Sequence, residues 1–324
     1  MNSNSGRRRT EATVDSEART GRLQWRWERG QAAVAVALTL VVLVAFVAIV
    51  IDLGNVYSQR RLMQNAADAG ALAGARLLAL EHPLEEIDAA VREYTMVRNG
   101  ASSYGVSVVS ATVGVTVSKS FSTYLAAVIG VDEMTVWASA AADYSFPLSW
   151  EGGLMPLCID QDVVDAGRVA TQPIQIWDDP AVLSDPVAGI WANGHRGWLN
   201  FNGGDVGDDE LKIWAATGYG GLITPPMDIN GSPGMKTATL KVMADLWEGK
   251  LVYFPVYDSF TLSDHTLGSG QYDYHITAFA AFKVTDVVDT AHPKYIAGYF
   301  VETVVVQERG GPIDNGVRVI GLVQ

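Results

Sequence analysis

Residues 32–51 read AAVAVALTLVVLVAFVAIVI, an apolar run between Arg29 and Asp52 that contains no charge, no Gly and no Pro. A helix of this length would be about 30 Å long, which matches the hydrocarbon thickness of a bilayer. Thr39 is its only polar residue, whereas a helix in a soluble core carries a broader polar stripe. The run therefore predicts a transmembrane helix from Ala32 to Ile51.

The charges on either side of the run predict its orientation. The preceding segment has seven Arg against four acidic residues, whereas the rest of the chain is strongly acidic within a total of −13. Because basic flanks stay in the cytoplasm, we expect a single-pass protein of the cell membrane with a cytoplasmic amino terminus and an extracytoplasmic carboxy-terminal part. A cleaved secretory signal fits less well, since its apolar region is shorter and a small-x-small site should follow.

The acidic balance excludes nucleic acid as an expected partner, because a phosphate-binding surface needs clustered Lys and Arg. The only basic cluster is Arg7–Arg9, which we interpret as part of the orientation signal. Cys158 is the only cysteine, so an intramolecular disulfide is impossible. We expect a buried thiol there, with an intermolecular disulfide as the alternative.

The pattern beyond the run predicts one long helix. Residues 1–28 are polar and are expected to form a disordered cytoplasmic segment. Helix formers continue without Pro as far as His82, so one helix should cover residues 29–80. Ala66, Gly70 and Gly74 then recur on one face, and such small residues allow close approach of another helix. We expect this face to dock onto another protein or a second copy, with Gly70→Ala tolerated and Gly70→Leu disruptive.

The residues around the span form a longer motif. Arg-Gly precedes the span, Asp-x-Gly closes it, and QNAADAGALA follows at residues 64–73. Over residues 28–78 this motif resembles the amino-terminal signature of TadE/TadG-like proteins of Flp (tight adherence) pilus assembly, and the similarity to TadG members extends through Ala142. Met63 and Gly70 depart from the signature. The matching residues are Arg29, Gly30, Asp52, Gly54, Gln64, Asn65, Ala66, Ala67, Asp68, Ala69, Ala71, Leu72 and Ala73.

The resemblance implies a membrane-anchored structural component of Flp/Tad-type pilus assembly or surface attachment. Such a protein would act by helix packing and extracytoplasmic interactions, with other pilus-assembly proteins or its own copies as partners. Type IV pilins carry Glu five residues after the processing Gly, and counting from Gly30 this position is Ala35. We therefore expect an unprocessed anchor, with a processed minor pilin as the alternative.

The remaining chain predicts an α+β fold. A helix from Pro83 to Asn99, strands around Val106–Val108, Val113–Val117 and Val136–Ala140, and a helix over residues 122–129 suggest a small α+β domain at 81–148. Phe146–Gly153 is the expected boundary. Residues 149–324 predict a β-rich, sandwich or barrel-like domain with two helices. Its strands are expected near Leu157 and at 174–177, 197–201, 251–257, 272–288, 295–307 and 317–323, and its helices at 208–216 and 236–247.

The sequence contains no nucleophile elbow, phosphate loop, zinc motif, Cys-x-x-Cys pair or dinucleotide fingerprint. We therefore expect no enzyme activity, no cofactor and no small-molecule ligand. The acidic group Asp205, Asp208, Asp209 and Glu210 offers oxygen ligands for calcium but lacks EF-hand spacing, and Asp208 also suits a helix cap. An anchored extracytoplasmic enzyme or carbohydrate-binding protein is the alternative function. Five Trp residues could line a glycan-binding or partner-binding surface, although we expect them to pack in the core by default: Trp177, Trp191, Trp198, Trp214 and Trp247.

Overall fold

The computed structural model describes residues 11–178, 197–203, 207–234, 236–262, 272–291 and 294–323. Its contacts divide the chain into two compact units. Of the described residues, one unit contains 11–63 and 118–138, and the other contains those of 64–117 and 139–323.

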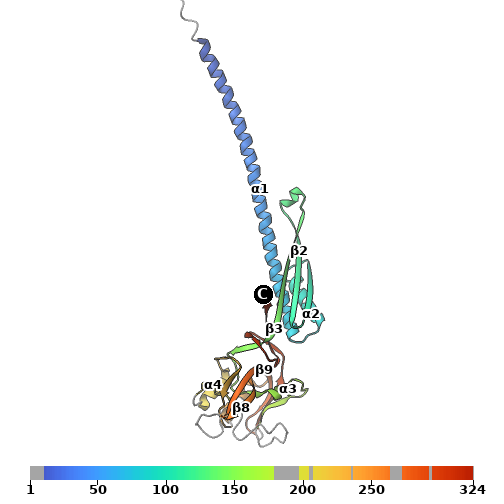
Figure 1. The fold of residues 1–324 in the computed structure, drawn as a ribbon, viewed down its shortest axis with the longest axis vertical. Helices are drawn as coiled ribbons and strands as arrows, with labels where there is room; N and C mark the ends of the chain where they lie inside the picture. The colour runs from blue at the N-terminus through green and yellow to red at the C-terminus, as the bar shows by residue number, and fades with distance from the viewer. Residues whose placement is uncertain are drawn as a thin grey trace, which may run out of the picture. The chain divides into compact units, whose positions relative to one another are not determined.

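The first element is helix α1, which runs from Glu11 to Ala79 (Figure 1). Residues 11–28 are helical where the sequence predicted disorder, because a formed helix extends into a segment without Pro and needs no new nucleation step. Residues 1–10 of that prediction lie outside the described residues.

Between Ala32 and Ile51 the apolar side chains of α1 are exposed all around the helix. Val36 is 65% exposed and Phe46 is 64% exposed. The most apolar window has a mean hydropathy of 3.3, and none of it is buried inside the protein. This helix is long and apolar enough to cross a membrane, which indicates single-pass anchoring.

Helix α1 ends shortly before Glu81, whose φ of 60° is incompatible with a continuing helix, and before Pro83. Pro83 is the N-cap of α2 (Leu84–Arg92), which continues into the π-helical turn η1 (Glu93–Val97). Ile87 and Val91, four residues apart on one face of α2, are buried.

A seven-stranded sheet has the strand order β1-β2-β3-β13-β11, with β12 and β6 also paired to β3. β13 lies antiparallel to β3, with Val319 opposite Ser145 and Val323 opposite Ala141, whereas β11 and β13 are parallel. The strands are β1 (Ser103–Val109), β2 (Thr112–Ser122), β3 (Glu133–Glu151), β6 (Leu222–Ile223), β11 (Thr303–Val305), β12 (Glu308–Gly311) and β13 (Val317–Val323).

β3 is longer than the sequence predicted and runs through the expected boundary at Phe146–Gly153. Pro147 is tolerated in it because β12 pairs there irregularly, with register shifts on both sides of Arg309, so the missing N–H breaks no regular ladder. The sheet thus joins residues on both sides of position 148, and the division into domains at that position stays a prediction.

A six-stranded sheet has the order β4-β8-β9-β10-β5, with β7 paired to β9. Figure 1 shows β8 and β9 side by side at the centre of this region. Its strands are β4 (Ile159–Asp160), β5 (Ile174–Asp178), β7 (Met227–Asn230), β8 (Leu251–Leu262), β9 (Tyr272–Val288) and β10 (Tyr295–Phe300), and its helices are α3 (Gln161–Arg168), α4 (Asp208–Thr217) and α5 (Thr237–Trp247).

Three details differ from the sequence-based expectation. Helix α3 was missed because it is short, although Asp160 caps it by accepting a hydrogen bond of 2.8 Å from the Asp162 backbone N–H. Residues 197–201 form only isolated bridges, and the strand expected at 295–307 is broken at Val301–Glu302. Among the described residues the sheets do not close into a barrel, so the fold is α+β with a β-rich region.

The core lies on both faces of β9. Ala278, Ala280 and Phe282 belong to one buried cluster, whereas Phe279 and Ala281 belong to another. This alternation follows from the two-residue period of a strand and explains why β9 reads as an almost continuous apolar run.

Candidate functional site

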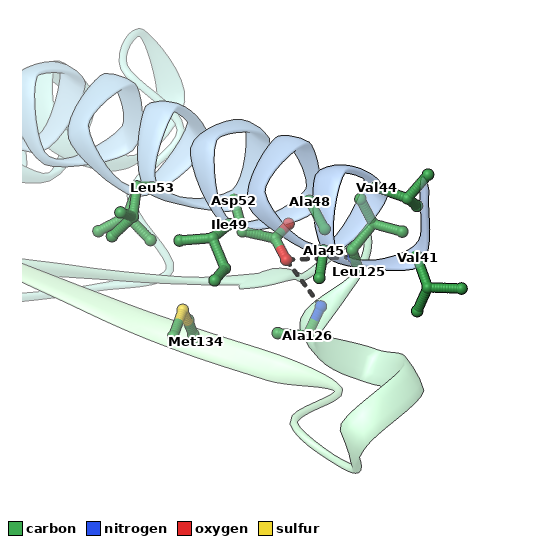
Figure 2. A pocket seen from close by; sticks show the side chains of 11 residues that line it. Val41, Val44, Ala45, Ala48, Ile49, Asp52, Leu53, Leu125, Ala126 and Met134 are labelled. Atoms are coloured by element: carbon green, nitrogen blue, oxygen red, sulfur yellow. Dashed lines mark hydrogen bonds between the residues drawn. The ribbon is translucent and has the colours of Figure 1, made fainter. Parts of the chain in front are cut away.

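Asp52, the first residue after the span, holds a part of the chain that lies 72 to 74 residues further on. Its carboxylate accepts hydrogen bonds from the backbone N–H groups of Tyr124, Leu125 and Ala126, with N···O distances of 3.0, 3.1 and 2.7 Å. Figure 2 shows Asp52 beside Leu125 and Ala126. These donors belong to the loop between β2 and β3, here called the hairpin tip and comprising residues 123–131. Three consecutive donors on one carboxylate resemble the arrangement by which a helix N-terminus binds an anion.

The hairpin tip is folded tightly on itself. The 3-10 turn η2 (Ala126–Ile129) ends at Gly130, whose φ of 89° favours glycine. The Val131 N–H donates to the Ala126 carbonyl at 3.0 Å, and the Thr123 N–H donates to the Asp132 carbonyl at 3.0 Å. The sequence predicted a longer helix over 122–129, but β2 extends to Ser122 and leaves room only for this turn.

A groove with a volume of about 510 Å³ separates α1 from the hairpin tip (Figure 2). Seven apolar residues of α1 between Val41 and Val56 line it, at the three- and four-residue spacing of one helix face. The hairpin contributes Leu125, Ala126 and Met134, and Asp52 is the only charged residue in the lining. The groove is therefore an apolar channel with one carboxylate, which is already occupied by backbone donors.

The electrostatics of Asp52 follow from this geometry. The hydrogen bond from the Tyr124 N–H, together with those from Ala126 and Leu125, outweighs partial desolvation and holds the pKa of the Asp52 carboxyl below its ordinary value. Asp52 is therefore ionised at neutral pH, and its charge stabilises the start of η2.

A second polar residue of the motif, Gln64, also contacts the strand that follows the hairpin tip. Its side-chain amide donates to the Ser139 carbonyl of β3 at 3.2 Å and to Asp68 Oδ1, one turn further along α1, at 2.8 Å. Asp68 thereby orients Gln64, whereas Asn65 is exposed. The motif residues Asp52 and Gln64 each bind main-chain groups of the same hairpin, and this role was not predicted from the sequence.

The small residues Ala66, Gly70 and Gly74 are buried inside the chain. A Cβ atom on Gly70 would lie 2.7 Å from Thr95 Cγ2 of η1, and one on Gly74 would lie 2.9 Å from Val113 Cγ1 of β2. The prediction of a closely packed face is thus correct in kind but wrong in its partner. The chain's own η1, α2 and β2 cover this face, so no surface remains there for another helix.

Among the other motif residues, Ala67 and Ala71 are fully buried, whereas Gly30 and Gly54 are exposed on α1. Nothing approaches within 4 Å of a Cβ atom built on Gly30 or Gly54. Ala32 and Ile51, the ends of the predicted span, are exposed, and the side chain of Arg29 lies outside the described part.

The carboxy-terminal end of α1 is held by Arg318 of β13. This side chain is only 2% exposed, donates to the Ala79 carbonyl and forms ion pairs with Glu81 at 2.8 Å and Asp314 at 3.0 Å. Burial alone would lower the pKa of Arg318, but its carboxylate partners hold it above the ordinary value. Arg168 of α3 joins the same cluster through Glu302 at 2.8 Å. A cation at a helix C-terminus also compensates the helix dipole.

The acidic residues considered for calcium each contact a different group. Asp208 pairs with Lys236 and Asp209 with Lys212, both at 2.9 Å, while Glu210 accepts a hydrogen bond from Asn202. Asp205 lies outside the described residues. Among the residues that are described, no three of His, Cys, Asp and Glu lie close enough to share a metal ion.

The aromatic residues and the cysteine are mostly in the core. Trp198 is fully buried and Trp214 is 8% exposed, whereas Trp247 packs against the core and donates to the Ala215 carbonyl at 2.6 Å. Trp191 and the side chain of Trp177 lie outside the described part. Cys158 is buried as predicted, and burial raises the pKa of its thiol.

Within the part of the chain that the structure describes, one helix, α1, is long and apolar enough to cross a membrane, and Asp52 at the end of its apolar span caps a β-hairpin. Residues 30–77 match the model of the family described as putative Flp pilus-assembly TadE/G-like, which confirms the resemblance stated above. No curated protein and no solved structure matches the chain. The match covers α1 alone, from the start of the span to the turn before Ala79.

Proposed function

We propose that the protein is a membrane-anchored structural component of Flp/Tad-type pilus assembly or surface attachment, without a catalytic role. One observation carries the proposal: residues 30–77, which match the family model, are the same residues that supply the apolar span, the Asp52 cap and the Gly70–Gly74 packing face. The matched segment is thus both anchor and scaffold, and such a segment serves a structural role better than a chemical one.

In this proposal the amino terminus lies in the cytoplasm and everything after Asp52 lies outside. The excess of Arg before the span and the acidic character of the rest support this orientation. Partners would be other Tad/Flp proteins or further copies of the chain. Because the Gly70–Gly74 face is covered by the chain itself, such partners would bind to the span or to the β-rich region instead.

The function is tested by deleting the gene and scoring surface attachment and extracellular pili. We expect both to be lost and to be restored by the full chain expressed at the parental level. A chain whose span is replaced by a cleavable secretory signal serves as the control, since it exports the outer part without an anchor and should not restore attachment. Parental attachment and pili in the deletion strain would refute the proposal.

Orientation is tested separately by proteolysis of cells whose wall has been permeabilised while the membrane stays intact. The part after Asp52 should be digested, whereas an epitope placed before Trp25 should survive until the membrane is lysed. Protection of the outer part in intact membranes would show that the assigned orientation is reversed.

A further inference from the structure

The hairpin tip lies beside residues that belong to the predicted span. Leu125 and Ala126 line one groove together with Val41, Val44 and Ala45, all of which precede Ile51 (Figure 2). Asp52 fixes the position of the hairpin tip along α1, because its carboxylate binds three backbone N–H groups of the tip. A membrane that surrounds the span up to Ile51 therefore also reaches the tip.

The composition of the tip suits such a position. Residues 123–131 read TYLAAVIGV and contain no charged side chain, whereas Lys119 and the pair Asp132–Glu133 flank them. Tyr124 at the start of the tip is 68% exposed. Tyr favours the headgroup region, and charged residues stay on its aqueous side, so the sequence limits how far the hairpin can enter.

The backbone of the tip is also prepared for a poorly hydrated environment. An unpaired N–H group is costly where water is scarce, and irregular loops are therefore excluded from lipid unless their polar groups are satisfied. Six backbone N–H groups between Thr123 and Val131 donate hydrogen bonds, and three of these six donate to the Asp52 carboxylate. The three that open η2 would have no partner in a free hairpin, since a helical turn leaves its first donors unpaired.

We propose that the hairpin tip is a second membrane contact, in which residues 123–131 enter the boundary between headgroups and acyl chains beside α1 and lipid chains fill the groove. This inference rests on the anchoring of α1 in a membrane, which is part of the proposed function. The lining of the groove extends to Val41, eleven residues before Asp52, so the groove reaches about 16 Å along the span at about 1.5 Å per residue. The tip backbone is bound at Asp52, at the outer end of this groove, which suits elements that lie about 5–10 Å deep in the membrane interface, and acyl chains would fill the deeper part beside Val41 and Val44.

Lipid fits the groove because its lining continues into the surface that faces the bilayer. Phe46 and Val50, on the same stretch of α1, are 64% and 68% exposed and would contact acyl chains. The contact would fix the rotation of α1 about its axis, since only one face of the helix carries the hairpin. A plain transmembrane helix has no such constraint.

The test uses the full chain in liposomes of phosphatidylcholine and phosphatidylglycerol, with an environment-sensitive fluorophore on single introduced cysteines. Cys158 is buried with a raised thiol pKa, so labelling goes to the introduced sites. The labels are placed at Ala127→Cys in the tip, Val44→Cys in the span and Trp137→Cys, an exposed position on β3 beyond the charged pair.

We expect lipids carrying a shallow nitroxide to quench the label at 127 as they quench the label at 44, and a water-soluble quencher to reach only the label at 137. A label at 127 that behaves like the one at 137, while 44 is quenched by lipid, overturns the inference and leaves the anchor intact. A further label at Val50→Cys, an exposed position of the span outside the groove lining, reports the anchor itself, and failure of lipid quenching there overturns the anchoring. A third outcome would also overturn the inference: neither quencher reaches the label at 127, and copies of the unlabelled Ala127→Cys variant form disulfide crosslinks with each other. This outcome would show that a second copy of the chain covers the groove.

A matched pair of variants separates insertion from folding. Ala127→Asp should move a label at Tyr124→Cys into water, whereas Ala127→Leu should leave it in lipid, because only a charge opposes entry into the interface. The label at 44 should stay lipid-quenched in both variants. Equal behaviour of the Asp and Leu variants would contradict a lipid contact at the tip.

Discussion

The carboxylate of Asp52 lies 2.7 Å from the backbone nitrogen of Ala126, although 74 residues separate them in the sequence. Asp52 closes the apolar span of α1, and Ala126 opens the turn at the hairpin tip. This contact joins the end of the apolar span to a β-hairpin and gives the Asp of the motif a structural task beyond ending the span.

Replacement of Asp52 should loosen the hairpin tip without unfolding the chain. We expect Asp52→Asn to speed amide hydrogen exchange at Tyr124, Leu125 and Ala126 by about tenfold, because charge-assisted hydrogen bonds are roughly twice as strong as neutral ones. Asp68→Asn is the matched control, since Asp68 lies on the same helix and its recorded contact is with Gln64. Unchanged exchange at the three amides in Asp52→Asn would contradict the cap.

The same contact predicts a dependence on pH. The pKa of Asp52 is lowered from 3.8, so an unfolded or detached tip takes up a proton before the capped one does. The stabilisation is therefore complete above about pH 4 and is lost as the pH falls through the lowered native pKa. Protection factors of the three amides, measured from neutral to acidic pH, should fall in that window, and Asp52→Asn should abolish this step.

The packing of α1 on η1 and β2 predicts that the two glycines resist even a small substitution. The sequence led us to expect that Gly70→Ala is tolerated, but the contact with Thr95 reverses this expectation. Gly70→Ala should lower the free energy of unfolding by about 1–2 kcal/mol, because overpacking outweighs the gain in helix propensity. Thr95 cannot easily move aside, since it is fully buried and its hydroxyl donates to the Val91 carbonyl at 2.7 Å. Gly54→Ala, with nothing within 4 Å of its Cβ, is the control and should be neutral or stabilising.

A double variant makes this prediction specific. Thr95→Ser keeps the hydroxyl and removes the Cγ2 methyl that a Cβ on Gly70 would meet at 2.7 Å. The loss caused by Gly70→Ala should therefore shrink in the Thr95→Ser background, as chemical denaturation of the two single variants and the double variant would reveal. If the losses of the two single variants simply add up in the double variant, the strain caused by Gly70→Ala does not arise from its contact with the Thr95 methyl group.

Arg318 predicts a large loss of stability on neutralisation. Arg318→Met should cost about 3–5 kcal/mol, because it removes the donor to the Ala79 carbonyl and the most buried cation of the cluster. Asp314 and Glu302 would then keep only Arg168 as a cation. Arg98→Met is the control and should cost less than about 1 kcal/mol, since its pair with Glu93 is half exposed on both sides. Comparable losses from the two variants in a thermal melt would refute the role of Arg318.

The last prediction concerns processing. Ala35 stands where type IV pilins have Glu, so we expect the mature protein to keep the residues before Gly30. Mass spectrometry of the protein from membranes should detect peptides that include Arg26 or Arg29. A dominant new amino terminus at Gln31 would instead make a processed minor pilin the better interpretation.

The sequence alone determined the elements that local patterns encode. The span at 32–51, the family match, and strands such as β9 and β13 were predicted because apolar composition or a two-residue period marks them directly. Helix α3 was not predicted, because a short helix gives a weak sequence signal. The extension of β3 through Pro147 was not predicted either, because its irregular pairing with β12 removes the usual penalty of proline in a strand.

Only the tertiary structure decided what the motif residues contact. Ala66, Gly70 and Gly74 indicated a close neighbour, but their spacing is the same whether the neighbour is another protein or η1 and β2 of the same chain. From the sequence, Asp52 was interpreted only as the end of a span. No residue near it in the sequence indicates that it binds Tyr124, Leu125 and Ala126. Periodicity reports which face of an element is buried, whereas the partner that buries it is fixed by contacts between residues far apart along the chain.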